Sequence, residues 1–230
     1  MIRLAPEGWP FVAGSLALTG LAVGVGAFLP PSSPRLSSVL WGLSALGLVL
    51  TAFVLFFFRN PVRRRRDADG LVLSPADGRI VEITPLDDDD LLLRPANRIS
   101  VFLSIFSVHI QRAPITGRVG LKSYRAGRFA MAWKSKASED NEQATLGIAD
   151  GPHRIIVRQI AGWVARRIVT DPEKGDLVPQ GSRIGLIRFG SRVDLFIPQE
   201  WELSCKVGDR VKGGLTALAR LPEPVDGKPT

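Results

Sequence analysis

The chain has 230 residues, of which 45% are hydrophobic and 23% are charged, and this composition excludes wholesale disorder. A single cysteine, Cys205, excludes an intramolecular disulfide and a cysteine-cluster metal site, while His109 and His153 are too far apart for a local His-x-x-x-His motif. The net charge of +8 favours a polyanion or the anionic surface of a membrane as partner.

The charges are unevenly distributed, and this divides the sequence into two regions. Residues 1–58 contain only three charged residues. Two uncharged apolar segments, 8–34 and 36–58, are each close to the roughly 20 residues that a helix needs to cross a bilayer. The segment PPSSPR at 30–35 predicts a helix-breaking turn between them. We therefore predict an N-terminal transmembrane helical hairpin, although a hairpin that dips into one leaflet would have a similar sequence.

A basic run, Arg63–Arg66, follows the second apolar segment. The positive-inside bias places this run in the cytoplasm, so both ends of the hairpin face that side of the cell (inner) membrane. We assign residues 1–66 to the anchor and its basic juxtamembrane segment. A nucleic-acid site is the alternative for such a run, but basic residues beside a membrane segment usually contact anionic lipids, and we expect no nucleic-acid partner.

Residues 67–230 read as one β-rich α+β domain, barrel-like or built of packed sheets. One helix is expected over Gly162–Val169, and the run 206–215 (KVGDRVKGGL) resembles a strand–turn unit of lipoyl-like hammerhead folds. Short β-branched and aromatic segments separated by Gly, Pro or Asp predict strands at Arg79–Ile83, Ile99–Val108, Phe129–Lys134, Ala144–Ala149, Arg154–Ile160, Ile184–Phe189, Arg192–Ile197 and Leu203–Val207.

His109 is the first candidate for chemistry, because histidine is the usual general base near neutral pH. Strand alternation would place it on one face with Val101 and Leu103, at the end of an apolar strand. A hydrogen-bonded structural histidine is an equally good interpretation of the residue alone. His153, in a polar turn, is expected at the surface.

Two further motifs allow both a structural and a chemical interpretation. Asp77 precedes a glycine between two apolar segments, which is typical of a turn, but its carboxylate could also orient His109. Gly190-Ser191 interrupts two strands and could be a bulge. Chemically, the glycine carbonyl is open to attack, and the Ser191 hydroxyl can reach it through a five-membered ring if a base is nearby.

Several motifs in one order resemble those of the short-form bacterial phosphatidylserine decarboxylases, which are pyruvoyl-dependent and process themselves. The resemblance covers nearly the whole chain, and Phe-Gly-Ser-Arg fits the short group where the long forms have Leu-Gly-Ser-Thr. The matching segments are 58–61 (FRNP), 74–78 (SPADG), 106–114 (FSVHIQRAP), 136–142 (KASEDNE), 159–167 (QIAGWVARR) and 188–192 (RFGSR).

The resemblance implies that the chain cleaves itself between Gly190 and Ser191, with Asp77, His109 and Ser191 acting as a serine-protease-like triad. Ser191 would become a pyruvoyl group, which forms a Schiff base with phosphatidylserine and releases CO₂ to give phosphatidylethanolamine. Chains 1–190 and 191–230 would remain together as a heterodimer, and a higher oligomer is left open. No metal is expected.

The chemistry of decarboxylation supports this interpretation, because loss of CO₂ from an amino acid leaves a carbanion whose electrons need an acceptor. His109 is our candidate for returning a proton to the α-carbon. Arg112, Arg166 and Arg167 could hold the carboxylate or phosphate of the lipid, but solvated arginines are commoner. Two rival functions remain: a membrane-anchored serine hydrolase that uses the same three residues, and a non-enzymatic lipoyl-like membrane adaptor.

Overall fold

The structure is a computed structural model that describes residues 2–28, 34–63, 69–127, 141–162, 167–188 and 191–222. The chain divides into two compact units, residues 1–62 and 63–230, which are considered separately. The division falls just before the basic run, of which Arg63 is described and residues 64–66 lie outside the described ranges.

The first unit is a helical hairpin of α1 (Trp9–Ala27) and α2 (Pro34–Phe57), preceded by a 3-10 turn at Pro6–Gly8. Its ends are joined by an antiparallel pair of short strands, β1 (Ile2–Leu4) and β2 (Arg59–Pro61). Both helices are long and apolar enough to cross a membrane, as the sequence predicts. Most of the predicted turn between them lies outside the described residues.

Small and hydroxyl-bearing residues form the contact between the two helices. The Thr51 hydroxyl donates to the Ser15 hydroxyl of the other helix at 2.8 Å. A Cβ atom added to Gly47 would lie 2.1 Å from Oγ1 of Thr19, so only glycine permits this approach. Large apolar side chains, in contrast, are exposed on the outside of both helices. This is the arrangement expected where lipid is the solvent, since hydroxyls bond internally and small residues allow close packing.

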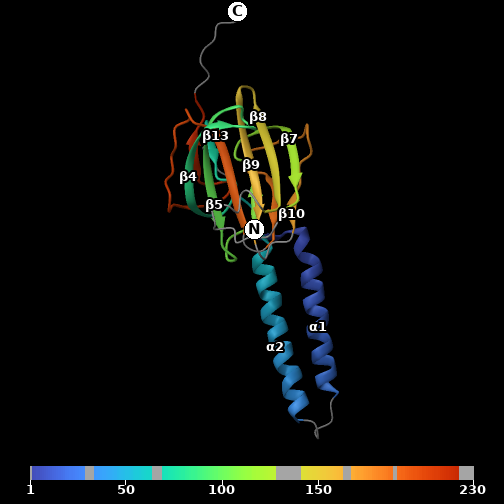
Figure 1. Ribbon diagram of the computed structural model, residues 1–230. Coiled ribbons are helices and arrows are strands. Elements are labelled where there is room, and N and C mark those ends of the chain that lie inside the picture. The colour runs from blue at the N-terminus through green and yellow to red at the C-terminus, as the bar shows by residue number, and fades with distance from the viewer. Residues whose placement is uncertain are drawn as a thin grey trace, which may run out of the picture. The chain divides into compact units, whose positions relative to one another are not determined.

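The second unit is a β domain whose main sheet has eight antiparallel strands and curls on itself (Figure 1). The order of strands in this sheet is β11 (Leu177–Val178), β7 (Gly117–Arg125), β8 (Gln143–Asp150), β9 (His153–Ala161), β13 (Ser191–Pro198), β5 (Arg94–Leu103), β4 (Gly78–Asp89) and β14 (Arg210–Val211). The smaller sheets are β10 (Ile168–Thr170), β12 (Arg183–Ile187) and β6 (Ile110–Arg112), and the pair β15 (Ala217–Arg220) and β3 (Leu71–Leu73).

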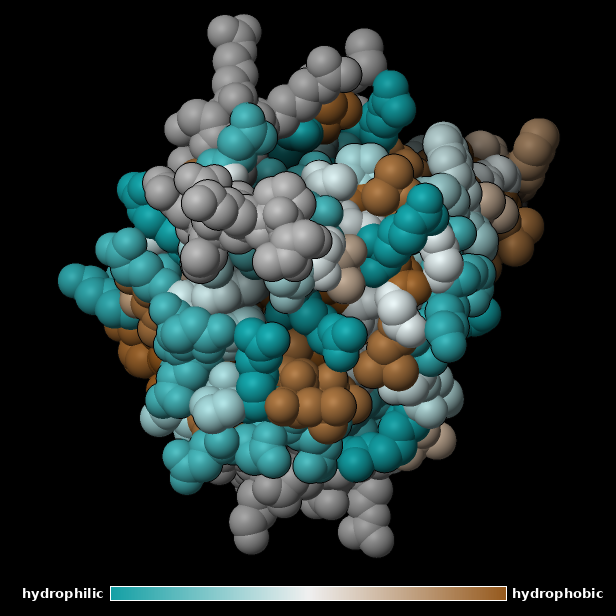
Figure 2. Space-filling view, turned by 90° about the horizontal axis from the view of Figure 1, so that it is seen from above, coloured by the Kyte–Doolittle hydropathy of each residue, from teal (hydrophilic) through white to brown (hydrophobic). Residues whose placement is uncertain are grey.

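The centre of the domain is β13, which lies between β9 and β5 and has every residue buried. Its Val193, Leu195 and Ile197 belong to the main hydrophobic core, as alternation along the strand predicts. Polar residues of the domain are mainly at the surface, and the face seen in Figure 2 is largely hydrophilic with separate apolar patches. A β-rich domain after two apolar helices is thus confirmed, while the likeness to hammerhead folds stays a prediction.

Three predicted elements of the domain are wrong in extent. The strand expected over Ile99–Val108 ends at Leu103, where a turn begins. Leu203–Val207 forms only an isolated bridge at Leu203. A helix is expected over Gly162–Val169, but its last two residues, Ile168 and Val169, belong to β10. Residues 163–166 lie outside the described ranges. The strand predicted at 129–134 also lies outside them.

Candidate active site around Ser191

Ser191 is the first residue of β13, where cross-strand neighbours hold it from both sides. Its partners are Leu103 of β5 and Ala161 of β9. The residue is completely buried, and its hydroxyl oxygen has no hydrogen-bond partner among the described residues. A buried hydroxyl without a partner costs about 1–3 kcal/mol. Such a group at the N-terminal end of a core strand is a candidate reactive group. Its neighbour Gly190 lies outside the described residues.

His109 lies in the connection between β5 and β6, not on the strand face that alternation predicted. The chain leaves β5 at Leu103 and turns through Ser104–Ser107 before it reaches the histidine. The ring is fully buried, and its Nδ1 lies 3.0 Å from the carbonyl oxygen of Ser107. Because a carbonyl can only accept, Nδ1 carries the proton. In the neutral imidazole, Nε2 is then the basic nitrogen, as a general base requires.

Backbone pairing brings His109 to the segment that leads into Ser191. The amide of Ile187, four residues before Ser191, donates to the His109 carbonyl at 3.4 Å, next to the β6–β12 pair. The Gln111 side chain donates to the same carbonyl at 3.0 Å and accepts from Gln159 at 2.9 Å. This buried amide chain links the histidine loop to β9, which is the neighbour of β13. The spacing of Gln111 and Gln159 in the chain does not indicate this contact.

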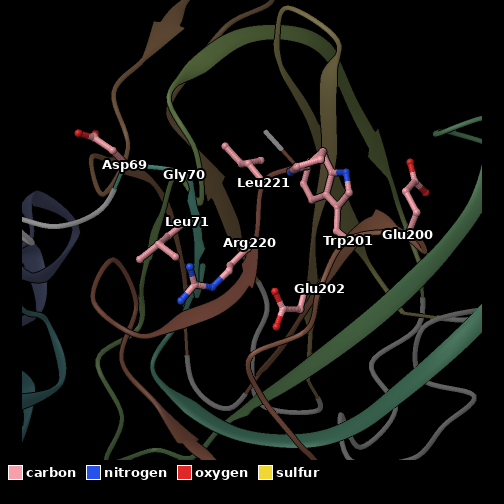
Figure 3. A pocket seen from close by; sticks show the side chains of 9 residues that line it. Asp69, Gly70, Leu71, Glu200, Trp201, Glu202, Arg220 and Leu221 are labelled. Atoms are coloured by element: carbon pink, nitrogen blue, oxygen red, sulfur yellow. The ribbon is translucent and has the colours of Figure 1, made fainter. Parts of the chain in front are cut away.

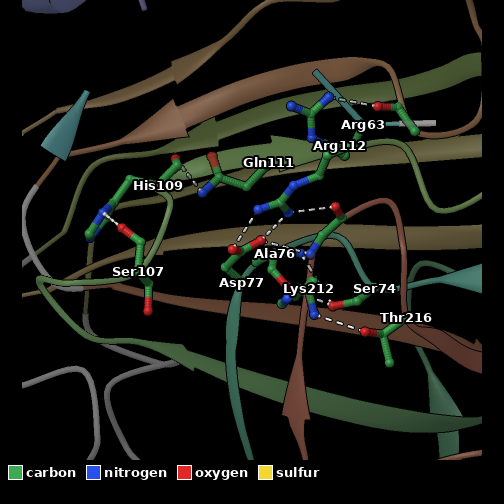
Figure 4. Close-up of polar contacts among 12 residues, drawn as sticks. Arg63, Ser74, Ala76, Asp77, Ser107, His109, Gln111, Arg112, Lys212 and Thr216 are labelled. Carbon is green, nitrogen blue, oxygen red and sulfur yellow. Dashed lines mark hydrogen bonds and ion pairs between the residues drawn. The ribbon is translucent and has the colours of Figure 1, made fainter. Parts of the chain in front are cut away.

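Asp77 precedes β4, and its carboxylate has other partners than His109. Arg63 donates to both carboxylate oxygens, and the amide of Gly213 donates to Oδ1 at 2.8 Å. In Figure 4 the His109 ring points toward Ser107 and away from this pair. The structure therefore brings Asp77 together with Arg63, a residue that the sequence assigns to the juxtamembrane run. The spacing of the two residues carries no signal of their contact.

Of the candidate arginines within the described ranges, Arg112 is buried. Its guanidinium donates to the Gly181 carbonyl at 2.9 Å, on the same side of the domain as Asp77 and Arg63. Burial and then the charge of Arg63 lower the pKa of Arg112, while Asp77 opposes that shift. Arg167 is exposed, and Arg166 lies outside the described residues.

The residue after the serine, Arg192, faces the opposite side of the sheet. It is almost fully buried, and its guanidinium donates to Asp194 at 2.6 Å, to the Ser100 hydroxyl at 2.6 Å and to Glu82 at 3.1 Å. Burial raises the pKa of Glu82, but the hydrogen bond with Thr84 and the charges of Arg98 and Arg192 bring it below its usual value. This ion-pair network fixes the strand one residue beyond Ser191.

A cavity of about 560 Å³ lies at the other end of β13 from Ser191, beside Trp201 (Figure 3). Charged side chains line it, among them Glu200, Glu202 and Arg220. His153, expected at the surface, is half-buried and packs edge-on against Trp201 with ring centres 5.7 Å apart. Within the described ranges, no three His, Cys, Asp or Glu residues are grouped as a metal site requires.

Comparison with known proteins identifies the family. A sequence model of the family described as phosphatidylserine decarboxylase matches residues 50–219. A phosphatidylserine decarboxylase proenzyme of Symbiobacterium thermophilum is 42% identical over 221 residues, which is 96% of both chains. Proenzymes of the same name from Salinibacter ruber (44% identical, 92% of this chain and 90% of the relative) and Saccharopolyspora erythraea (43%, 94% and 87%) are also similar. This chain belongs to the phosphatidylserine decarboxylase family.

Proposed function

We propose that the chain is a phosphatidylserine decarboxylase, made as a proenzyme that cleaves itself between Gly190 and Ser191. The observation that carries the proposal is the buried Ser191 hydroxyl at the start of the central strand, which has no hydrogen-bond partner in the part of the chain that the structure describes. A nucleophile awaiting an adjacent carbonyl accounts for a cost that a structural serine would avoid. The relatives named as proenzymes support a precursor that must be processed.

In the first step, His109 accepts the Ser191 proton while the hydroxyl oxygen attacks the carbonyl carbon of Gly190. The peptide C–N bond breaks, and an ester and a free amine replace it. Removal of the α-proton of residue 191 then expels the Gly190 carboxylate, which becomes the new C-terminus. The resulting dehydroalanine takes up water and loses ammonia, and a pyruvoyl group remains at the N-terminus of the small chain.

Asp77 stays our candidate for orienting the imidazole of His109, although its present partners are Arg63 and Gly213. Its carboxylate is held by Arg63 and the Gly213 amide, so it must exchange Arg63 before it can accept a bond from His109. The Ser107 carbonyl meanwhile holds Nδ1. Substitution of Arg63 therefore tests the role of Asp77: Arg63→Ala speeds processing if Asp77 serves His109, and slows it if the pair only anchors the chain.

The pyruvoyl group supplies a ketone that accepts the electrons released as CO₂ leaves the amino acid. The residues of this chain provide its surroundings. The Arg192 network fixes the strand that carries residue 191, and β5 and β9 exclude water from both sides. His109, free of its first task after cleavage, returns a proton to the α-carbon. Phosphatidylserine is the substrate.

The two chains, 1–190 and 191–230, stay together as a heterodimer in this proposal. After cleavage β13 still lies between β9 and β5 of the large chain. The remaining small-chain strands, β14 and β15, pair with β4 and β3 of the large chain. The ion pair between Arg192 and Glu82 also joins the two chains.

We further propose that the apolar hairpin anchors the enzyme in the cell (inner) membrane, with the β domain on the cytoplasmic side. Two helices long enough to cross a bilayer support this, and the basic run after them favours the cytoplasmic side. A diacyl lipid leaves a bilayer slowly, so an anchored enzyme meets its substrate where the lipid resides.

Mass spectrometry of the full-length protein, purified in detergent, tests the cleavage. We expect two chains split between residues 190 and 191, the smaller of roughly 4 kDa by its 40-residue share of 25.0 kDa. Its N-terminus should react with a hydrazine reagent. His109→Ala should stay uncut, and His153→Ala is the matched control that should mature normally.

The other outcomes separate the rival functions. Active enzyme that is a single chain with a free serine overturns the proposal. An uncut chain that reacts with a serine-directed phosphonate indicates a membrane-anchored hydrolase. An uncut chain that is inert to the phosphonate, and that leaves lipid composition unchanged when Ser191 is replaced by alanine, indicates an adaptor.

A further inference from the structure

The turn that leads from β5 to His109 exposes two large apolar side chains. The Ser107 amide donates to the Ser104 carbonyl at 2.9 Å, and the two serine hydroxyls lie 3.3 Å apart. Ile105 and Phe106 occupy the two central positions, where 44% and 65% of their surfaces are exposed. Turn centres usually hold Gly, Pro, Asn, Asp or Ser. An isoleucine and a phenylalanine at such a tip therefore need an explanation beyond turn formation.

This tip lies at the same end of the sheet as Ser191. Leu103, the residue before the turn, is the cross-strand partner of Ser191. The turn also continues directly into the His109 loop, where the Ser107 carbonyl holds the imidazole. A surface that contacts the tip consequently lies near the residues that we assign to cleavage and decarboxylation.

The link to the hairpin enters the domain at this same end. Arg63 is bound to Asp77. The two residues after Asp77, Gly78 and Arg79, begin β4, where Arg79 pairs with Phe102 of β5. The chain that comes from the hairpin therefore enters the β domain at the end that carries the tip.

We propose that Ile105 and Phe106 form a hydrophobic tip that inserts into the lipid bilayer and seats the active end of the domain on the membrane surface. This inference rests on the membrane attachment proposed above. A bilayer fits the tip better than a protein partner does, because two side chains are far fewer than the 20–30 residues a side of a standard interface. Apolar side chains flanked by the Ser104 and Ser107 hydroxyls also match the boundary between acyl chains and headgroups.

Site-specific fluorescence in the full-length protein tests the insertion. The background variant is Cys205→Ala, which removes the one native cysteine. A single cysteine then carries an environment-sensitive dye at Phe106→Cys, at Leu93→Cys or at Leu48→Cys, in vesicles of phosphatidylcholine and phosphatidylglycerol. Leu93 is the matched control, since it is an exposed apolar residue in the turn at the opposite end of β5. Leu48 faces outward on α2 and reports on the hairpin itself.

We expect lipid-borne quenchers to quench the dyes at 106 and 48, and to leave the dye at 93 unchanged. Quenching at 48 with a water-exposed dye at 106 overturns the insertion of the tip while the hairpin anchor stands. A water-exposed dye at 48 overturns the membrane attachment on which the inference rests. Equal quenching at 106 and 93 also contradicts the proposal, because it shows no preferred end. None of these readouts depends on decarboxylase activity.

Turnover provides a second measurement that does not depend on the dye. Phe106→Asp should raise the apparent KM for phosphatidylserine in vesicles about 10-fold or more, because the burial of one phenylalanine is lost. The KM for a short-chain, water-soluble phosphatidylserine should not change. Leu93→Asp should change neither value. An equal effect of Phe106→Asp on both substrates would show damage to the His109 loop and would contradict membrane insertion.

Discussion

The hairpin and the β domain distribute their polar and apolar side chains in opposite ways. In the hairpin, Ser15 and Thr51 bond to each other between the helices, while Leu48 and most other large apolar residues are exposed. In the domain, Val193 and Leu195 are completely buried. The membrane anchor that we propose accounts for this difference, because lipid accepts leucine on the outside of a helix and water does not.

The comparison also explains where a buried hydroxyl is stable. Ser15 and Thr51 bond to each other, as hydroxyls within the proposed membrane anchor must. Ser191 is more deeply buried than either and has no hydrogen-bond partner among the described residues. The two hairpin hydroxyls are thus structural groups, while the Ser191 hydroxyl is the one for which we propose a reaction.

The largest expected effect comes from removing one hydroxyl in each region. Ser191→Ala should abolish processing and all decarboxylase activity, because no nucleophile remains to form the pyruvoyl group. Ser15→Ala, the matched change in the hairpin, should leave processing intact. Gel electrophoresis and release of CO₂ from phosphatidylserine measure both outcomes. Normal cleavage in Ser191→Ala would place the cut at another residue.

The second prediction compares a leucine buried in the core of the domain with a leucine exposed on the hairpin. Leu195→Ala in the core should lower the free energy of unfolding by about 2–5 kcal/mol, because it leaves a cavity. Leu48→Ala on the outer face of α2 should leave the stability of the domain unchanged. Urea unfolding in detergent, followed in a Ser191→Ala background so that one chain unfolds, measures the difference. Equal losses would contradict the separation of the two units.

The third prediction concerns packing within the hairpin. Gly47→Leu should force the helices apart, since its side chain would overlap Thr19, at a cost of about 1–3 kcal/mol. Gly42→Leu is the control, because no atom lies within 4 Å of its added Cβ. Spin labels at Leu16→Cys and Leu48→Cys, with Cys205 replaced by alanine, report the interhelical distance. An unchanged distance in Gly47→Leu would show that the helices are not in close contact there.

The smallest effect is expected from the charges beside β13 in the domain. The lowered pKa of Glu82 means that its ionised form stabilises the fold above the usual carboxyl value of 4.5 and that this contribution disappears as the pH falls through the lowered value. Glu82→Gln should therefore reduce stability slightly at neutral pH and have no effect in strong acid. Melting temperatures across the acid range measure this.

The control for that experiment is Glu200→Gln, because the ion pair of Glu200 with Arg94 is largely exposed and exposed pairs contribute little. If the melting temperatures of Glu82→Gln and the unmodified protein differ by the same amount across the acid range, the role of the Glu82 charge is contradicted. If Glu82→Gln changes the melting temperature no more than Glu200→Gln does, the buried Arg192 network does not depend on the Glu82 carboxylate.

Much of the fold follows from local patterns. Unbroken apolar segments with a proline-rich interruption predict α1 and α2, and strict alternation predicts the inward face of β13. The errors occur where local patterns continue past a tertiary change. The apolar character of Ile105 and Phe106 extended the predicted strand beyond Leu103, although these residues lie in a turn. A sequence records that a residue is apolar and does not record which solvent it meets.

In the candidate site, too, some features follow from local sequence and others depend on tertiary contacts. The family could be identified from the residues, because several motifs, Gly190-Ser191 among them, occur in the order that the family has. The partners of Asp77 and His109 were not evident: Arg63 lies 14 residues before Asp77, and the group that holds the imidazole is a backbone carbonyl. Backbone carbonyls are present at every residue and leave no mark in a sequence.

Side-chain types at neighbouring positions are enough to define the apolar helical hairpin, the β-rich domain and the Gly190-Ser191 motif. Three features depend on the folded chain instead: β13 lies between β9 and β5, Arg63 holds Asp77, and the apolar tip lies at the same end of the sheet as Ser191. These are contacts between distant residues, and their geometry depends on how the whole sheet curls and pairs.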